Sequence, residues 1–196
     1  SHAAAPHFRS MIKYIGSKRT LVPAIVEIVA AIPGVGTVCD LFTGTTRVAQ
    51  GLKRAGYFVT ANDSASYSEV LARAYIEADA AGVDFAEIER KLAFLAALPG
   101  RRGYFTETFC VRSRYFQPHN GARVDAIRPE IDRIAASPIE HAILLTSLME
   151  AADRVDSTTG LQMAYLKDWA PRSYHDLELR LPRLLDGPGK ALRGDA

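Results

Sequence analysis

Two aspartates, Asp40 and Asp63, end short apolar runs rich in β-branched and aromatic residues, the composition of buried strands. After Asp40 a lone glycine, Gly44, precedes a helical pattern, so a strand, a tight turn and a helix N-terminus follow one another. This order exposes backbone N–H groups to a ligand. A carboxylate at the end of the second strand can accept hydrogen bonds from both hydroxyls of a ribose, and Asp40 can accept from an ammonium group. The spacing predicts a nucleotide-type ligand site, with helix or turn capping as the alternative role of each aspartate.

Other kinds of site fit the sequence less well. A dinucleotide site requires Gly-x-Gly-x-x-Gly after the first strand, whereas Gly34 and Gly36 precede it. The sequence contains neither the Gly-Lys-Ser/Thr of a P-loop nor a nucleophile elbow. Its five histidines do not cluster, and its two cysteines fit neither a metal site nor a disulfide framework. We therefore expect no metal site.

Arginines are interleaved with aromatic residues in two later segments, 101–116 and 165–175, the second of which holds the only tryptophan. In an extended segment Arg112 and Arg114 would share one face. Arginines suit contacts to phosphates, and aromatic rings suit stacking on an exposed base. A solvated basic face over buried rings explains both segments equally well. The candidate nucleic-acid contacts are Arg101, Arg102, Arg112, Arg114, Lys167 and Arg172.

The elements that must position these residues alternate between helix and strand. The order β-α-β-α is typical of a parallel, doubly wound sheet with a Rossmann-like α/β fold. Thr46 should cap the helix that follows the glycine turn. Apolar spacing predicts a helix over 18–31, a strand ending at Asp40, a helix from Thr46 to Gly56, a strand over 57–61 and a helix over 67–79.

After Gly82 the strand pattern disappears, and apolar spacing predicts three helices up to Ala152. Because three parallel strands cannot form a stable open sheet covered on both faces, we expect the sheet to continue beyond Ala196. The predicted organisation is a leader or expression remnant at 1–10, a ligand-binding α/β part at 11–82, a mostly helical insertion at 83–189 and a returning strand at 190–196.

The composition is that of an ordinary globular chain. The 196 residues are 48% hydrophobic and 23% charged, which suits one sizeable domain or a core with one insertion. The net charge of +2 argues neither for nor against nucleic acid. No apolar run approaches the length of a membrane span, so we expect no membrane partner. Cys39 lies in an apolar strand and should be buried, and the cysteine usage favours the reducing cytoplasm.

Three motifs in this order resemble the start of the Dam-like DNA adenine methyltransferases, whose cofactor motifs come first. They are Lys13-Tyr-Ile-Gly-Ser-Lys18, Asp40-Leu-Phe-Thr-Gly-Thr-Thr46 and Asn62-Asp63. Segments 103–109 and 153–160 are also similar to one bacterial branch of that family, so the resemblance covers nearly the whole chain. It implies a class I methyltransferase fold with a target-recognition insertion, S-adenosylmethionine as cofactor, and double-stranded DNA as substrate.

The resemblance also implies roles for single residues. By position in the motifs, Tyr14, Gly16 and Lys18 would contact the methionine part of the cofactor. Asp63 would hold the ribose hydroxyls, and Asp195 would lie where the family contacts the cofactor adenine. The glycine turn beneath the cofactor would consist of Asp40, Phe42, Gly44, Thr45 and Thr46.

The sequence departs from the family pattern at three points. Leu41 stands where the family usually has proline, and Thr46 stands where it has a second glycine. The catalytic tetrapeptide Asp-Pro-Pro-Tyr occurs nowhere in the 196 residues. The intact enzyme is expected to methylate the exocyclic amine of adenine, and this chain alone to be inactive. The alternatives are a non-catalytic module that binds DNA or a partner, and an amino-methyltransferase that acts on RNA.

Overall fold

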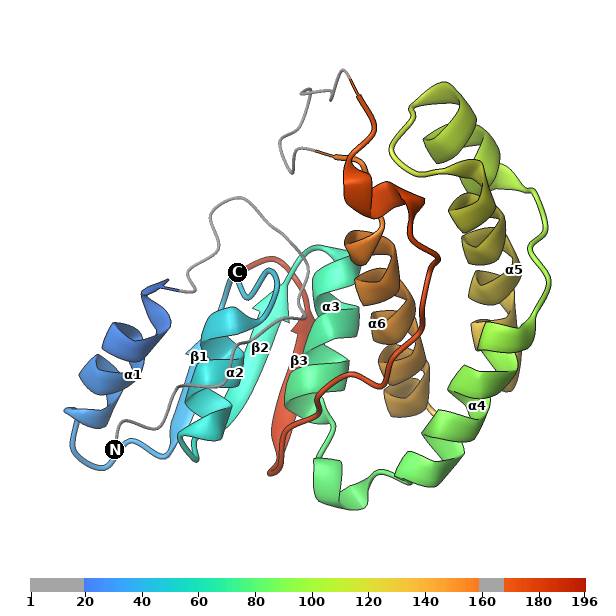
Figure 1. The fold of residues 1–196 in the computed structure, drawn as a ribbon. Helices are drawn as coiled ribbons and strands as arrows, with labels where there is room; N and C mark the ends of the chain where they lie inside the picture. Colours follow the sequence, from blue (N-terminus) through green and yellow to red (C-terminus); the bar gives the residue numbers. More distant parts are fainter. Residues whose placement is uncertain (1–19, 159–167) are drawn as a thin grey trace, which may run out of the picture.

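The computed structural model describes residues 20–158 and 168–196 and contains a three-stranded parallel sheet (Figure 1). The strands are β1 (Thr37–Asp40), β2 (Phe58–Asp63) and β3 (Gly189–Arg193), in the order β1-β2-β3. Cys39 pairs with Thr60 in the register, and Thr60 with Lys190. The predicted Rossmann-like α/β class is confirmed.

Helices precede the sheet and connect its strands. The long helical stretch between β2 and β3 contains two π-helical segments, η2 and η4, which the sequence pattern did not distinguish from α-helix. Within the described residues no helix is long and apolar enough to cross a membrane. The helical elements are α1 (Val22–Ala30), α2 (Arg47–Arg54), α3 (Ser66–Ala72), η2 (Arg73–Glu77), η3 (Ala80–Gly82), α4 (Phe85–Ala97), η4 (Thr106–Arg112), α5 (Pro118–Ile134), α6 (Pro138–Arg154) and η5 (Pro171–Tyr174).

One face of the sheet is packed and the other is exposed. Both crossovers run in the same direction across the sheet, and right-handed connections therefore place α2 and α3 on one face, as Figure 1 shows. Val59 and Ala61 are fully buried on that face, whereas Phe58 is exposed on the other. The prediction that Cys39 is buried is wrong: its side chain is exposed, because it alternates with Val38, which packs against the covered face.

The helices between β2 and β3 form a second core beside the first. Leu92 of α4, Ile127 of α5 and Leu144 of α6 belong to this cluster, which also includes Ala74 of η2. Helix α6 packs on α3 and η2, so the two cores share that helical wall. Figure 1 shows α4, α5 and α6 on the β3 side of the sheet. The predicted helices in this part are present.

The buried amine of Lys53 closes the end of the π-helix η2. Its Nζ donates to the carbonyl oxygens of Ile76 and Ala78, at 2.7 Å each, and the side chain is 4% exposed. These are carbonyls that a helix C-terminus leaves without partners in the helix. Burial lowers the Lys53 pKa from 10.5 to about 8, although the negative charges of Asp79 and Asp186 partly oppose the shift.

This pKa predicts an unusual dependence of stability on pH. Between about pH 8 and pH 10.5, Lys53 is protonated in the unfolded chain and has lost its proton in the folded chain. The contribution of Lys53 to the free energy of unfolding should therefore rise with pH in this window. Below this window both states are protonated, and the cost of burying the charge is fully present. We expect the stability of the wild type relative to Lys53→Met, measured by urea denaturation, to increase across the window. Parallel pH profiles of the two proteins would contradict the assignment.

Candidate functional site

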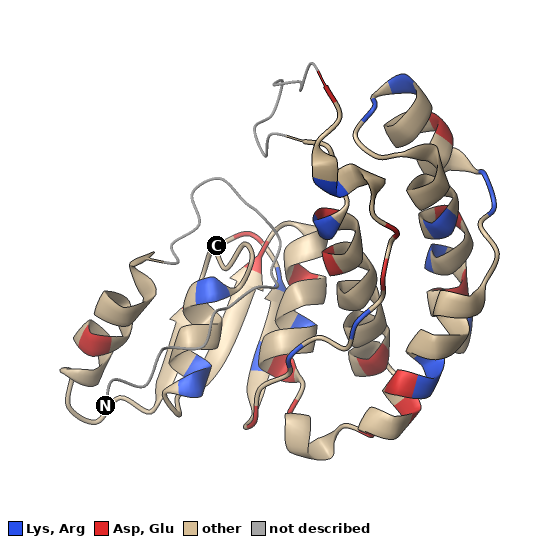
Figure 2. Cartoon of the chain, viewed as in Figure 1, with Lys and Arg blue, Asp and Glu red and all other residues tan. Residues whose placement is uncertain are grey.

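The carboxyl ends of the three strands bring the predicted ligand residues to one edge of the sheet. Asp40 ends β1, Asp63 ends β2, and Asp195 follows β3 after one glycine. Because the strands are parallel, these three positions must share an edge. Figure 2 shows acidic residues at the strand ends near the C-terminus. Such an edge suits a ligand that carries positive charge and hydroxyl groups.

The carboxylate of Asp63 is held across the glycine turn. Its Oδ2 accepts from the backbone N–H of Gly44 at 2.9 Å, and its Oδ1 accepts from the N–H of Ala65 at 3.0 Å. Gly44 has φ +52°, a conformation that favours glycine, and its N–H is directed at Asp63. Each carboxylate oxygen retains a further lone pair for a ligand hydroxyl. The turn therefore fixes the orientation of Asp63 before any ligand arrives.

The rest of the turn is built from the threonines and the exposed Phe42. The Thr43 hydroxyl donates to Asp40 at 3.1 Å, and the Thr46 N–H donates to the Thr43 carbonyl at 2.7 Å. Phe42, two residues after the end of β1, is 71% exposed. Thr45 lies half-buried between these residues.

Thr46 does not cap α2 as predicted. It occupies the N-cap position, but its hydroxyl donates to the Thr45 carbonyl and accepts from Gln50 Nε2, at 2.7 and 2.9 Å. Its φ is +62°, so the side chain faces away from the N–H groups that a cap would bind. A β-branched residue is strained there by about 1 kcal/mol, which explains why a glycine would suit this position.

Not every predicted ligand contact lies within the described residues. Tyr14, Gly16 and Lys18, and the predicted nucleic-acid contact Lys167, fall outside 20–158 and 168–196. The others, from Asp40 to Asp195, lie at the last residues of the strands or on the loops that follow them, and the structure brings these together at the sheet edge.

The predicted nucleic-acid contacts lie in the helical part. Figure 2 shows Lys and Arg residues along the loop between α4 and η4 and around η4. Arg101 and Arg102 are exposed on that loop, and the Arg101 N–H donates to the Ala122 carbonyl at 2.9 Å. Arg112 and Arg114 do not lie in an extended segment, the case in which they would share one face, because Arg112 ends the π-helix η4 and Arg114 has φ +54°.

The arginines differ in what holds their guanidinium groups. Arg112 makes an exposed ion pair with Glu107 at 3.4 Å. Arg172 is bound to Asp156 at 2.6 Å, and it also donates to the Thr158 carbonyl. Arg114 instead lies over the ring of Trp169, 5.1 Å from its centroid. A cation–π contact uses the face of the guanidinium and leaves its in-plane N–H donors available, whereas an ion pair occupies them.

Asp125 anchors the arginine-bearing loop, and the sequence contained no signal for it. Its carboxylate accepts from the N–H groups of Gly103, Phe105 and Thr106 at 2.8–2.9 Å, and from the Thr106 hydroxyl. Burial alone would raise the Asp125 pKa, but these hydrogen bonds outweigh it and hold the pKa below its usual value. The loop after Arg102 is therefore tied to α5 by one side chain.

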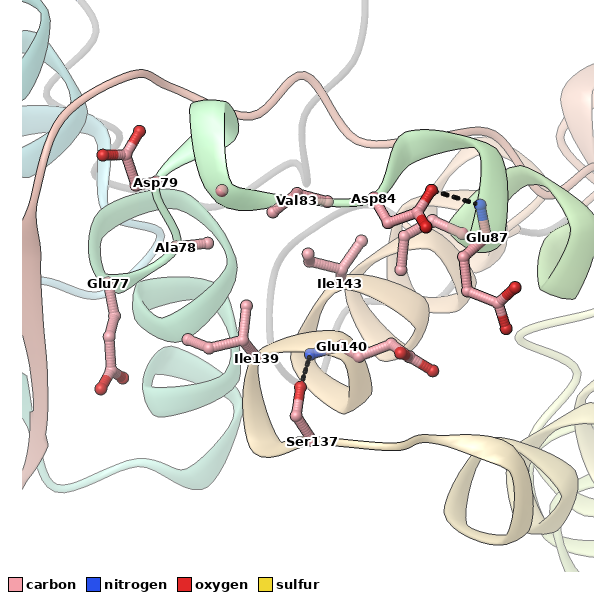
Figure 3. A pocket seen from close by; sticks show the side chains of 12 residues that line it. Glu77, Ala78, Asp79, Val83, Asp84, Glu87, Ser137, Ile139, Glu140 and Ile143 are labelled. Atoms are coloured by element: carbon pink, nitrogen blue, oxygen red, sulfur yellow. Dashed lines mark hydrogen bonds between the residues drawn. The ribbon is translucent and has the colours of Figure 1, made fainter.

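A pocket of about 410 Å³ lies far from the carboxyl ends of the strands, between η2 and the starts of α4 and α6. The close-up in Figure 3 shows the hydrogen bonds that cap these helices, Asp84 to the Glu87 N–H and Ser137 to the Glu140 N–H. The residues that line the pocket include three glutamates, Glu77, Glu87 and Glu140. Glu87 and Glu140 are both paired with Lys91, and the pocket lies away from the carboxyl ends of the strands.

Comparisons with known proteins agree on one family. The sequence model of the D12 class N6 adenine-specific DNA methyltransferases matches residues 14–192. The chain is 33% identical over 202 residues to Modification methylase StsI of Streptococcus sanguinis, an alignment that covers 94% of this chain and 31% of that protein. It is 31% identical over 180 residues to the type II methyltransferase M.NlaIII of Neisseria lactamica, covering 86% of this chain and 53% of that one.

The chain spans about a third of the first of these relatives and about half of the second. No solved structure matches it significantly. The family model nevertheless covers the loops after β1 and β2, the helical part and most of β3. The chain therefore belongs to the D12 class of N6 adenine-specific DNA methyltransferases.

Proposed function

We propose that the protein is part of an enzyme that transfers a methyl group from S-adenosylmethionine to the exocyclic amine of adenine in double-stranded DNA. The observation that carries this proposal is the Asp63 carboxylate, fixed across the Gly44 turn at the carboxyl edge of a parallel sheet. Family membership supports the reaction, and the names of the relatives support a role in DNA modification. The two free cysteines suit the cytoplasm.

Each residue at the sheet edge has a distinct proposed task. Asp63 accepts hydrogen bonds from the ribose hydroxyls, and Asp40 faces the cationic methionine part. The exposed ring of Phe42 packs against the cofactor, and Asp195 lies beside its adenine. When bound, S-adenosylmethionine supplies an electrophilic methyl group on a sulfonium. The protein residues bind and orient this group at an edge whose negative charge favours it.

The groups that would activate the target amine are not in this chain. The family places an aspartate side chain and a proline carbonyl as acceptors of the adenine amine, and Asp-Pro-Pro-Tyr is absent from the sequence. We therefore propose that the 196-residue chain alone binds the cofactor without transferring the methyl group. Binding of S-adenosylmethionine, measured by calorimetry, tests the first part of this statement, and a radiolabelled methyl assay tests the second.

The reaction itself is tested with three substrates for the intact enzyme. They are DNA from a host without adenine methylation, the same DNA synthesised with N6-methyladenine, and RNA of the same sequence. We expect label from S-adenosylmethionine only in the first. Equal labelling of the N6-methylated DNA would exclude adenine N6 as the target, and labelling of the RNA alone would identify an RNA enzyme. If the protein binds DNA but transfers no methyl group, only the alternative of a non-catalytic DNA-binding module remains.

The arginines of the helical part should contribute unequally to DNA binding. Arg102→Ala should weaken binding equally for all sequences and lower the slope of log K against log salt by about 1, as loss of one phosphate contact does. Arg112→Ala should have a smaller effect, because Glu107 already neutralises Arg112. Arg133, an exposed arginine paired with Glu130 at the far end of α5, is the control. Equal effects of Arg102→Ala and Arg133→Ala would contradict the proposed contact between Arg102 and a phosphate.

A further inference from the structure

Asn62, the residue before Asp63, makes contacts that join all three strand ends. Its Nδ2 donates to the carbonyl oxygens of Leu41 and Gly194, at 3.2 Å each. The backbone carbonyl of Asn62 accepts from the Thr43 N–H at 3.0 Å. The loop after β1 and the loop after β3 thus meet at one side chain of the central strand.

We propose that Asn62 is a positioning residue for the cofactor site. Leu41 lies between Asp40 and Phe42, and Gly194 directly precedes Asp195, so the two clamped carbonyls belong to the loops that carry the proposed cofactor contacts. The Gly194 N–H also donates to the Asp63 carbonyl at 3.1 Å, which closes the second loop on β2. This inference rests on the proposed function, because it assigns Asn62 to the same site.

Among side chains of this length, only an amide suits the contact. Two carbonyl oxygens face the same nitrogen, and only a group with two N–H donors satisfies both. A carboxylate of the same shape would place negative charge against both carbonyls and close to Asp63. A hydroxyl carries one donor and could satisfy only one of them.

Asn62 owes its burial to these loops rather than to the core. It is 9% exposed, although it lies on the sheet face where Phe58 is exposed. The core residues Val59 and Ala61 lie on the opposite face, beneath the helices. Loss of the amide should therefore loosen the loops while leaving the packed face of the sheet intact.

Asn120 provides a matched control in the helical part. It is 1% exposed, its Nδ2 donates to the carbonyls of His175 and Ser173 at 2.8 and 3.4 Å, and its Oδ1 accepts from the Leu177 N–H. Like Asn62, it ties a loop to a regular element through two carbonyls. It differs in having no contact with the strand ends.

The test compares S-adenosylmethionine affinity, by calorimetry, with thermal stability in Asn62→Asp, Asn62→Ala and Asn120→Asp. We expect both Asn62 variants to lose at least about tenfold in affinity with a small change in Tm. Asn120→Asp should lower Tm and leave the affinity within about twofold of the wild type. The affinity of Asn62→Asp should partly recover at low pH relative to wild type, because a protonated carboxyl can donate one hydrogen bond.

Each outcome decides the inference. Wild-type affinity in Asn62→Ala would overturn the role of Asn62 and leave the proposed function standing. Loss of affinity in Asn120→Asp equal to that in Asn62→Ala would mean that general destabilisation causes it, and would also overturn the role. Absence of cofactor binding by the wild type would remove the proposed function and this inference together. If Asn62→Asp does not fold, Asn62→Ala still decides between these results.

Discussion

Replacing Asp63 with alanine should lower the affinity for S-adenosylmethionine by about 100-fold or more, because two hydrogen bonds to a charged group are lost. The substitution also frees the Gly44 N–H, whose partner is Asp63 Oδ2 at 2.9 Å. Both effects act on the cofactor edge, so the loss should be the largest of any single substitution there. Calorimetric titration of the wild type and Asp63→Ala measures it directly.

Asp79 offers a control with the same type of hydrogen bonding. Its Oδ1 accepts from the N–H groups of Ala81 and Gly187, at 3.1 and 3.0 Å, but it lies beyond η2, away from the strand ends. Asp79→Ala should lower stability and leave cofactor affinity unchanged. Wild-type affinity in Asp63→Ala, or an equal loss in both variants, would contradict the assigned role of Asp63.

Replacing Gly189 with alanine should destabilise the fold by about 3 kcal/mol, which for a chain of this length lowers Tm by about 6–12 °C. A Cβ on Gly189 would lie 2.3 Å from the Ile76 carbonyl oxygen and 2.9 Å from its Cγ2. The obstacle is backbone, which cannot rotate away as a side chain can. That carbonyl also accepts from Lys53, so a shift of η2 would break a buried hydrogen bond.

Gly36 is the matched control for this prediction. It immediately precedes β1 as Gly189 begins β3, and a Cβ there would meet nothing within 4 Å. Urea and thermal denaturation of Gly36→Ala should resemble the wild type. A Gly189→Ala protein as stable as Gly36→Ala would show that β3 can move away from η2 at little cost.

The sequence alone determined the parallel sheet and the edge at which the aspartates meet. Short β-branched runs ending at Asp40 and Asp63, separated by a helical pattern, permit few arrangements other than a β-α-β unit. In that unit the carboxyl ends of neighbouring strands are adjacent, so the proximity of Asp63 to the Gly44 turn follows from topology. The presence of the helices, though not their exact bounds, followed from apolar spacing for the same reason, since periodicity reports the buried face.

Only the tertiary structure decided which polar groups pair. Arg112, Arg114 and Arg172 are equivalent as sequence letters, yet one binds a glutamate, one lies on an indole and one binds Asp156. Asp125 is one of several charged residues on α5, and nothing in its neighbours along the chain reveals that it binds a loop about 20 residues away.

The wrong predictions for Cys39 and Thr46 also arise because contacts between distant segments cannot be read from local sequence. Cys39 was expected to be buried because an apolar strand is usually covered on both faces in a parallel sheet, but right-handed crossovers put the described helices on one face. Thr46 has the residue type of a helix cap and a backbone conformation that prevents it from acting as one. Residue type and spacing specify the local secondary-structure preference and the apolar face of each element. Pairing, strain and which face is covered depend on segments distant in the chain, and these are set only when the whole molecule packs.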